Sequence, residues 1–184
     1  ALLCAGAMGF AVQAHALGIT PATSNIPVSG NDALSADQVE SLTGYAGQLA
    51  SVYKAEYVTS APTVPTEEGL GMGYYTTVFT STDMDDDGPS GATITWDGGL
   101  WIDCPDCFLV VKDGDQDPSA YIFNLGSWDG QEPITLSNFW GGATSASGAI
   151  SYVEIFGSPT DGGGPPLMVP EAETYAMMLA GLGL

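Results

Sequence analysis

Two runs of aspartates carry the clearest chemical potential in this sequence. The stretch 113–117 places carboxylates at alternate positions, a spacing that converges oxygen atoms on one hard cation, as in the first half of a calcium loop. The stretch 83–87 packs four carboxylates into five residues, and their repulsion is relieved by solvent or by a cation. Calcium is the one cofactor that this pattern suggests, and its expected ligands are Asp113, Asp115, Asp117, Asp85 and Asp87. The alternative is that both runs are solvated turns, because Asp-Gly is a common turn pair.

A CxxC pair, Cys104 and Cys107, allows three kinds of chemistry. A zinc site needs four ligands, and the sequence after residue 16 has no histidine and no other cysteine. A redox CxxC lies at a helix N-terminus, which lowers the thiol pKa, whereas here a strand pattern follows. We therefore expect a structural disulfide between Cys104 and Cys107, of the kind that persists in an oxidising compartment. It closes a very short loop, so its entropic contribution is small.

The tryptophans lie near the predicted strand ends, at positions 96, 101, 128 and 140. An exposed indole beside carboxylates can stack on the apolar face of a pyranose, and on this reasoning Trp101 and Trp128 are candidate ligand-binding residues. The alternative is that the rings cover the ends of the fold, because a tryptophan buries a large apolar area.

The charge balance excludes several functional classes. Lys54 and Lys112 are the only bases against 22 acids, and the net charge is -20. Such a field repels nucleic acid and anionic lipid. A serine or cysteine hydrolase needs a general base, usually histidine, and the single histidine lies in a segment that we expect to be removed. The sequence therefore predicts a protein that is not an enzyme, and a glycosidase built on two carboxylates is the remaining catalytic alternative.

The first 16 residues have the pattern of a truncated signal peptide. An apolar stretch to Val12 is followed by Ala14-His15-Ala16, and small residues at the first and third positions before the cut suit a signal peptidase. We expect export, with signal peptidase as a transient partner.

The C-terminal segment 169–184 combines the motif Val169-Pro170-Glu171 with the apolar run 176–184. This segment resembles the PEP-CTERM sorting signal, in which a Val-Pro-Glu-Pro-type motif precedes a transmembrane helix. Ala172 stands where the family usually has a second proline. The resemblance implies export by a bacterium that makes exopolysaccharide, transient anchoring in the inner membrane, recognition by an exosortase, and release to the cell surface or extracellular matrix. The visible apolar run is a stub of that helix, since a full span needs about 20 residues.

Between the two ends, the pattern predicts an all-β domain. Ser35 and Gln38 form a capping box, flanked by Leu34 and Val39 as a hydrophobic staple, so we expect a short helix over 36–47. Short apolar runs separated by turn clusters then predict strands at about 52–58, 73–81, 92–96, 107–112, 120–125, 134–139 and 149–156. This spacing is typical of an antiparallel two-sheet β-sandwich, with a jelly-roll-like arrangement.

The predicted organisation has five parts. They are a signal peptide (1–16), a lead-in with the short helix (17–48), the β-sandwich domain (49–157), a Gly/Pro linker (158–168) and the sorting tail (169–184).

The segment 73–157 also resembles the uncharacterised ectodomains that precede PEP-CTERM tails. It has a CxxC before an FLVVKDG-type strand, a W-x-G turn and a closing GAIS-type strand. We therefore expect a structural or adhesive protein of the surface or the exopolysaccharide matrix. Its partners would be the two processing enzymes and exopolysaccharide, and it would meet membranes only through its terminal segments. The alternatives are a calcium-dependent carbohydrate-binding module and, less favoured, a glycosidase.

Overall fold

The computed structural model describes residues 16–30, 32–59, 64–81, 88–113, 116–140, 149–158 and 162–163. These residues form two β-sheets packed face to face, with strands that are largely antiparallel, so the predicted all-β sandwich is confirmed. The predicted signal peptide up to His15, the sorting tail with its helix stub, and the candidate ligands Asp85, Asp87 and Asp115 lie outside the described residues.

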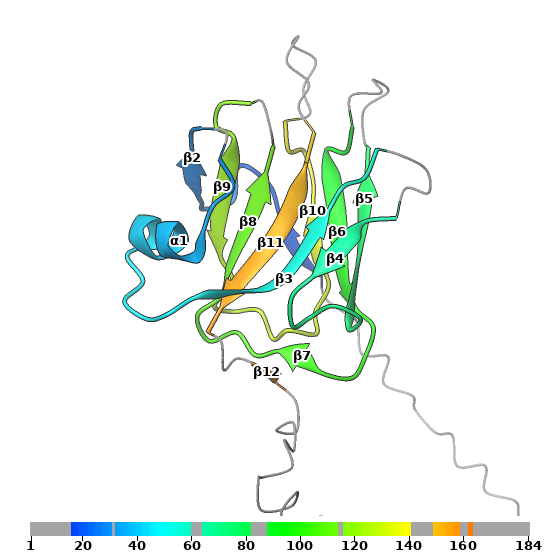
Figure 1. Cartoon of the computed structure of the whole chain (residues 1–184). Helices are drawn as coiled ribbons and strands as arrows, with labels where there is room; N and C mark the ends of the chain where they lie inside the picture. Colours follow the sequence, from blue (N-terminus) through cyan, green and yellow to red (C-terminus); the bar gives the residue numbers. More distant parts are fainter. Residues whose placement is uncertain are drawn as a thin grey trace, which may run out of the picture.

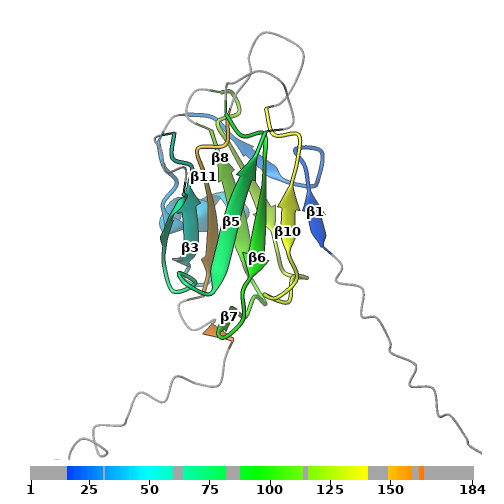
Figure 2. The same ribbon diagram turned by 90° about the vertical axis from the view of Figure 1, so that its right-hand side faces the viewer.

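One sheet has four strands in the order β1-β10-β6-β5. These are β1 (Leu17–Ile19), β10 (Ile134–Leu136), β6 (Gly91–Trp96) and β5 (Tyr75–Thr80). β1 runs parallel to β10, and the other pairs are antiparallel. Figure 2 looks onto this sheet.

The second sheet has six strands in the order β2-β9-β8-β11-β3-β4. These are β2 (Ile26–Val28), β9 (Ala120–Asn124), β8 (Phe108–Lys112), β11 (Tyr152–Gly157), β3 (Ala50–Glu56) and β4 (Thr66–Glu68). A small two-stranded ladder of β12 (Gly162–Gly163) and β7 (Trp101–Ile102) lies at the lower end of the sandwich in Figure 1.

The segment 17–48 differs from the prediction, because it belongs to both sheets instead of leading into them. β1 pairs with β10, and β2 pairs with β9. Each of these strands is only three residues long, too short for an alternating pattern to be recognised. Pro27 also argues against a strand from sequence, yet proline is tolerated in β2 because that strand lies at a sheet edge.

The main core lies between the sheets, where alternate side chains of each strand point inward. It includes Tyr75, Ile94 and Ile134 from the four-stranded sheet and Leu109, Val153 and Ile155 from the six-stranded sheet, all buried. Burial of such apolar surface provides most of the free energy that holds the two sheets together.

A second core covers the outer face of the six-stranded sheet. The helix α1 (Ala36–Thr43) places Val39 on this face, with Leu34, beside Phe108, Val110 and Ile122. The predicted capping box is present, and the helix ends at Gly44, which has a φ of 70°. α1 stops earlier than predicted because this left-handed position terminates it. β8 is buried on both faces for this reason, which explains its unbroken apolar run.

The outer face of the four-stranded sheet carries no charged side chain from its strands. The outward positions of β5, β6 and β10 are Thr76, Val78, Thr80, Thr93, Thr95 and Thr135, all exposed or half-buried. The acids of this strongly negative chain are therefore carried by other surfaces and by the loops.

The buried hydroxyl of Tyr53 connects the two sheets. Tyr53 on β3 donates to Glu67 Oε1 on β4 at 2.9 Å and lies 2.8 Å from the hydroxyl of Thr77 on β5. Glu67 Oε1 also accepts from the backbone N–H of Thr77 at 3.1 Å. These bonds join an edge of one sheet to an edge of the other.

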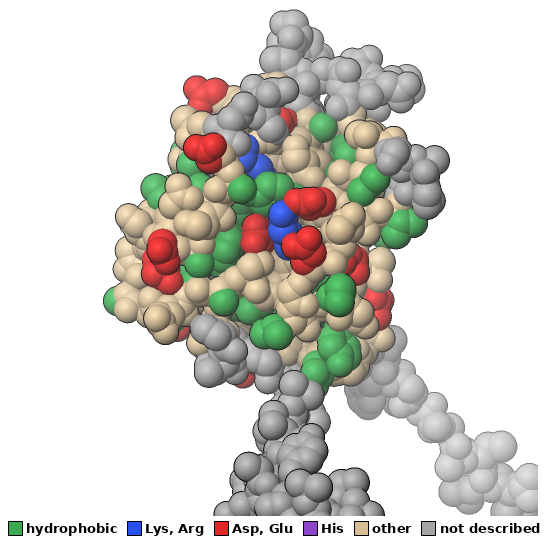
Figure 3. Space-filling model, viewed as in Figure 1, with side chains coloured by type: hydrophobic (Ala, Val, Ile, Leu, Met, Phe, Trp, Pro, Cys, Tyr) green, Lys and Arg blue, Asp and Glu red, His purple; other side chains and the backbone are tan. Residues whose placement is uncertain are grey.

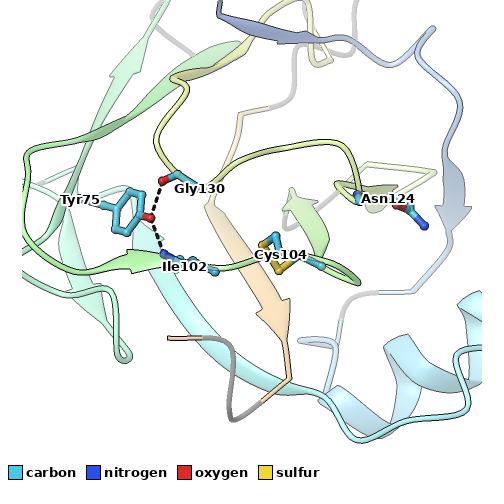
Figure 4. Close-up of a disulfide and its surroundings, with 7 residues drawn as sticks. Tyr75, Ile102, Cys104, Asn124 and Gly130 are labelled. Atoms are coloured by element: carbon cyan, nitrogen blue, oxygen red, sulfur yellow. Dashed lines mark hydrogen bonds between the residues drawn. A yellow bond between two sulfur atoms is a disulfide. The ribbon is translucent and has the colours of Figure 1, made fainter. Parts of the chain in front are cut away.

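The hydroxyl of Tyr75 fastens the lower loops (Figure 4). It donates to the carbonyl of Gly130 at 2.6 Å and accepts from the N–H of Ile102 at 2.8 Å. Burial raises the pKa of Tyr75 to about 12, so the phenol stays protonated and keeps donating at physiological pH.

We expect Tyr75→Phe to destabilise the fold by about 1 to 3 kcal/mol, because the change leaves a buried N–H and a buried carbonyl without this partner. Urea denaturation followed by tryptophan fluorescence measures the loss. Tyr74→Phe removes a hydroxyl from the neighbouring half-buried ring and is the matched control. An equal loss in both variants would contradict the bridging role of Tyr75.

Candidate functional site

The loop that follows β8 carries the two described aspartates of the predicted calcium motif. Asp113 is buried, with 4% of its surface exposed, and its N–H donates to the carbonyl of Ser119 at 2.8 Å. Its own carbonyl accepts from the ammonium group of Lys112. Asp117 is exposed and accepts from the hydroxyl of Ser29 at 2.5 Å. The two carboxylates therefore occupy different environments, one inside the protein and one at its surface.

The same loop is tied to the edge strand β2. The N–H of Ser119 donates to the carbonyl of Val28 at 2.8 Å, and its hydroxyl donates to the carbonyls of Val28 and Gly30. Ser119 is 1% exposed. The loop after β8 is consequently held by hydrogen bonds against the end of β2 and the residues that follow it.

Backbone hydrogen bonds bring the flanks of both aspartate runs to the upper end of the sandwich in Figure 1. Ser151 N–H donates to Lys112 O at 2.7 Å, and Ile150 N–H donates to Pro89 O at 2.7 Å. Lys112 precedes one run and Pro89 follows the other. Within the described ranges, no group of three or more acidic, histidine or cysteine side chains is arranged to hold a metal. Asp115, Asp85 and Asp87 lie outside those ranges, so the calcium site stays a prediction.

The tryptophan beside the acidic loop is Trp140, which the prediction did not single out. Its indole N–H donates to the carbonyl of Pro118 at 2.9 Å, and its half-buried ring lies 5.4 Å from that of Tyr121. No local sequence signal indicates this contact, because 22 residues separate the two partners.

Trp128 and Trp101 lie at the other end of the sandwich. Trp128 is 3% exposed, its indole N–H donates to Glu132 O at 2.6 Å, and its backbone N–H donates to Leu125 O. Leu125 in turn bonds the carbonyl of Cys107, just before β8, whereas Asp113 just follows it. The five residues of β8 lie between Cys107 and Asp113, and a strand of that length spans roughly 16 Å. Trp101 packs edge-on against Trp96 at 6.4 Å and belongs to β7. The structure thus does not bring these two predicted ligand-binding residues to the acidic loop.

The predicted disulfide joins Cys104 and Cys107 at the lower end (Figure 4). The two residues are 4% and 0% exposed. Thiol exchange requires access to the sulfur atoms, so this burial favours a structural role.

A cavity of about 340 Å³ lies between α1 and the β2–β9 edge, next to the acidic loop. Its walls come from Val28, Ser29, Gly30, Asp32 and Leu34, from the α1 residues Gln38, Ser41 and Leu42, and from Ser119 and Ala120. Sequence reasoning missed it because these segments are distant along the chain. One signal existed, since Leu42 fits the apolar pattern of the helix yet is 44% exposed beside the cavity.

The outer face of β11 and β3 holds one lysine among several carboxylates (Figure 3). Lys54 forms an ion pair with Glu56 and lies 4.7 Å above the ring of Tyr152. Burial lowers the pKa of Lys54, but the hydrogen bond to Glu56 and the charges of Glu56 and Glu154 outweigh it and raise the pKa overall.

Glu154, in the same cluster, is only 8% exposed. Burial raises its pKa, a hydrogen bond to Ser51 and the charge of Lys54 oppose the rise, and the charges of Glu56 and Glu68 add to it. The net pKa lies above the ordinary value of 4.5. Ionised Glu154 is therefore less favourable in the folded protein than in the unfolded chain.

We expect Glu154→Gln to stabilise the protein relative to the native chain at neutral pH. A raised folded-state pKa contributes stability below pH 4.5, and this contribution is lost as the pH rises through the folded-state value. The difference in Tm should therefore be small in acid and grow as the pH rises above 4.5. Thermal melting between acidic and neutral pH measures it. Glu68→Gln removes an exposed carboxylate of the same cluster as the control, and an equal gain in both variants would refute the role of burial.

We also expect millimolar calcium to raise the Tm. An extracellular site with a Kd of about 0.1 to 1 mM gives about 1 to 3 kcal/mol of stabilisation at roughly 10 mM calcium. Asp115→Asn combined with Asp117→Asn should abolish the rise, because these carboxylates are predicted ligands, and the described one, Asp117, is exposed. Asp103→Asn with Asp106→Asn removes two exposed carboxylates from the other end as the control. If calcium leaves the Tm of the native protein unchanged, the metal hypothesis is refuted.

No protein-family model matches this chain, and neither the curated proteins nor the solved structures contain a match. Across the described residues, no helix combines the length and the apolar character that a bilayer crossing requires.

Proposed function

We propose that this chain is an exported structural or adhesive component of the cell surface or the exopolysaccharide matrix. The observation that carries the proposal is that three indole N–H groups donate hydrogen bonds to backbone carbonyls of the protein itself. Those of Trp96, Trp128 and Trp140 donate to the carbonyls of Leu100, Glu132 and Pro118 at 3.0, 2.6 and 2.9 Å. These rings fasten loops at both ends of the sandwich, which favours a rigid module over an open platform for stacking sugars.

Three further features support the proposal. The buried disulfide suits an oxidising compartment. The charge of -20 keeps copies soluble and apart. β11, from late in the chain, lies between β8 and β3, a crossover compatible with a jelly-roll-like arrangement. In this proposal the chain has no catalytic activity, signal peptidase and an exosortase process its ends, and Val169, Pro170 and Glu171 form the sorting motif.

The test is the location of the full-length gene product in its native host. An epitope tag inserted after Ser158 should be recovered from the cell surface or the matrix fraction, with Cys104 and Cys107 oxidised as judged by thiol alkylation. Pro170→Ala with Glu171→Ala should shift the tagged protein to the inner-membrane fraction, because the sorting motif is removed.

Glu173→Gln changes a nearby acid outside the motif and is the control for that experiment. Recovery of the tagged protein from the cytosol with reduced cysteines would overturn the proposal. Unchanged release of the motif variant would overturn the sorting mechanism.

A calcium-dependent carbohydrate-binding module is the second candidate. One observation favours it, namely that Trp140 lies against Pro118, the neighbour of Asp117. In this function Trp140 is the residue that stacks on the sugar, which is the role that the sequence analysis gave to Trp101 and Trp128. The glycosidase hypothesis gains no comparable observation.

A further inference from the structure

The cavity beside α1 is a feature of the described surface that the proposed function does not yet use. It measures about 340 Å³ and opens between the helix and the edge of the six-stranded sheet. This volume lies at the lower end of the range for small-molecule sites, about 300 to 1,000 Å³. It has room for one sugar ring.

The lining combines a few polar groups with small apolar side chains. Ser29, Asp32, Gln38 and Ser41 supply hydroxyl, carboxylate and amide groups, and Leu34 and Leu42 supply aliphatic surface. Gln38 spends its carbonyl oxygen on the N–H of Ser35 at 2.9 Å, so its NH₂ end is the donor that it can offer to a ligand. A pyranose has hydroxyls around its rim and C–H groups on its faces, which matches such a mixed lining.

Local contacts hold the cavity walls in place. The capping box fixes the first turn of α1, and Leu34 belongs to the second core. On the other side, Ser29 donates to Asp117, and the carbonyl of Gly30 accepts from Ser119. A site with such fixed walls loses little conformational entropy when it binds.

Charge narrows the class of ligand. Asp32 lines the cavity, and Asp117 adjoins it through Ser29, in a chain of net charge -20. These carboxylates repel uronic acids, phosphates and sulfates. Carboxylate and amide groups still hydrogen-bond to neutral hydroxyls.

We propose that this cavity binds one uncharged pyranose residue of a polysaccharide. The inference rests on the proposed matrix function, and it makes the contact with exopolysaccharide a property of the α1 cavity. The tryptophans of the loop ends take no part in it, and neither does calcium.

The experiment titrates the full chain with three probes, which are isomaltotriose, a glucosamine trimer and a galacturonic acid trimer. Saturation-transfer NMR detects binding, and amide shifts of the native protein map it. We expect isomaltotriose to bind with chelator present, and the shifts to gather at residues 28–42 and 119–120. The galacturonic acid trimer should not bind.

Ser41→Trp fills the cavity from an exposed helix position and should weaken isomaltotriose binding roughly tenfold or more. Ser127→Trp adds the same ring at an exposed site beside Trp128 and should leave the affinity within about twofold. Melting curves show whether each variant is folded. The amide shifts of the native chain decide the question if Ser41→Trp does not fold.

Three outcomes overturn the inference. The first is that isomaltotriose does not bind at millimolar concentrations. The second is that the amide shifts centre on Trp140. The third is that the glucosamine trimer is the only probe that binds. The first outcome would not affect the proposed surface location, because the location of the protein is measured separately in the host. A cytosolic protein that still binds isomaltotriose would sink the matrix proposal and keep the cavity.

Discussion

Two buried tyrosine hydroxyls must form hydrogen bonds inside the protein, and the rest of this structure depends on that constraint. A hydroxyl removed from water without a partner costs several kcal/mol, of the order of a large part of a domain's net stability. Tyr53 meets this demand by bonding to both sheets, and Tyr75 does so by bonding two loops at the lower end. The rings themselves are neighbours, 5.5 Å apart. One pair of neighbouring side chains thus bonds the two sheets to each other and fastens the end that carries the disulfide.

Those parts of the fold that depend on local sequence were predictable. The capping box of α1 lies within four residues, and β5, β6, β8 and β9 show apolar runs bounded by turns. β1 and β2 were not predictable, because three-residue strands gain their stability from partners more than 90 residues away. The second core was also missed, although β8 is apolar on both faces. That pattern suggests a covered sheet, and the capping box upstream marks the helix that covers it.

The candidate sites divide in the same way. The disulfide was predictable, since two residues separate its cysteines and the turn between them brings their side chains together. Trp101 and Trp128 were predicted to lie exposed beside carboxylates, but the length of β8 places them at the end opposite the acidic loop. Trp140 reaches that loop through the packing of whole strands. The α1 cavity draws on three separated segments, and no linear motif encodes such a surface.

The carboxylate of Glu67 has a consequence for how copies of this protein behave when crowded. β5 is the last strand of its sheet, and such an edge invites a neighbouring chain to extend the ladder. Glu67 already occupies the outward N–H of Thr77, so an incoming strand must first displace a charged group. At the far edge of the other sheet, Pro27 offers no N–H at all. The edge strands β5 and β2 are therefore poor templates for an added strand from a neighbouring molecule.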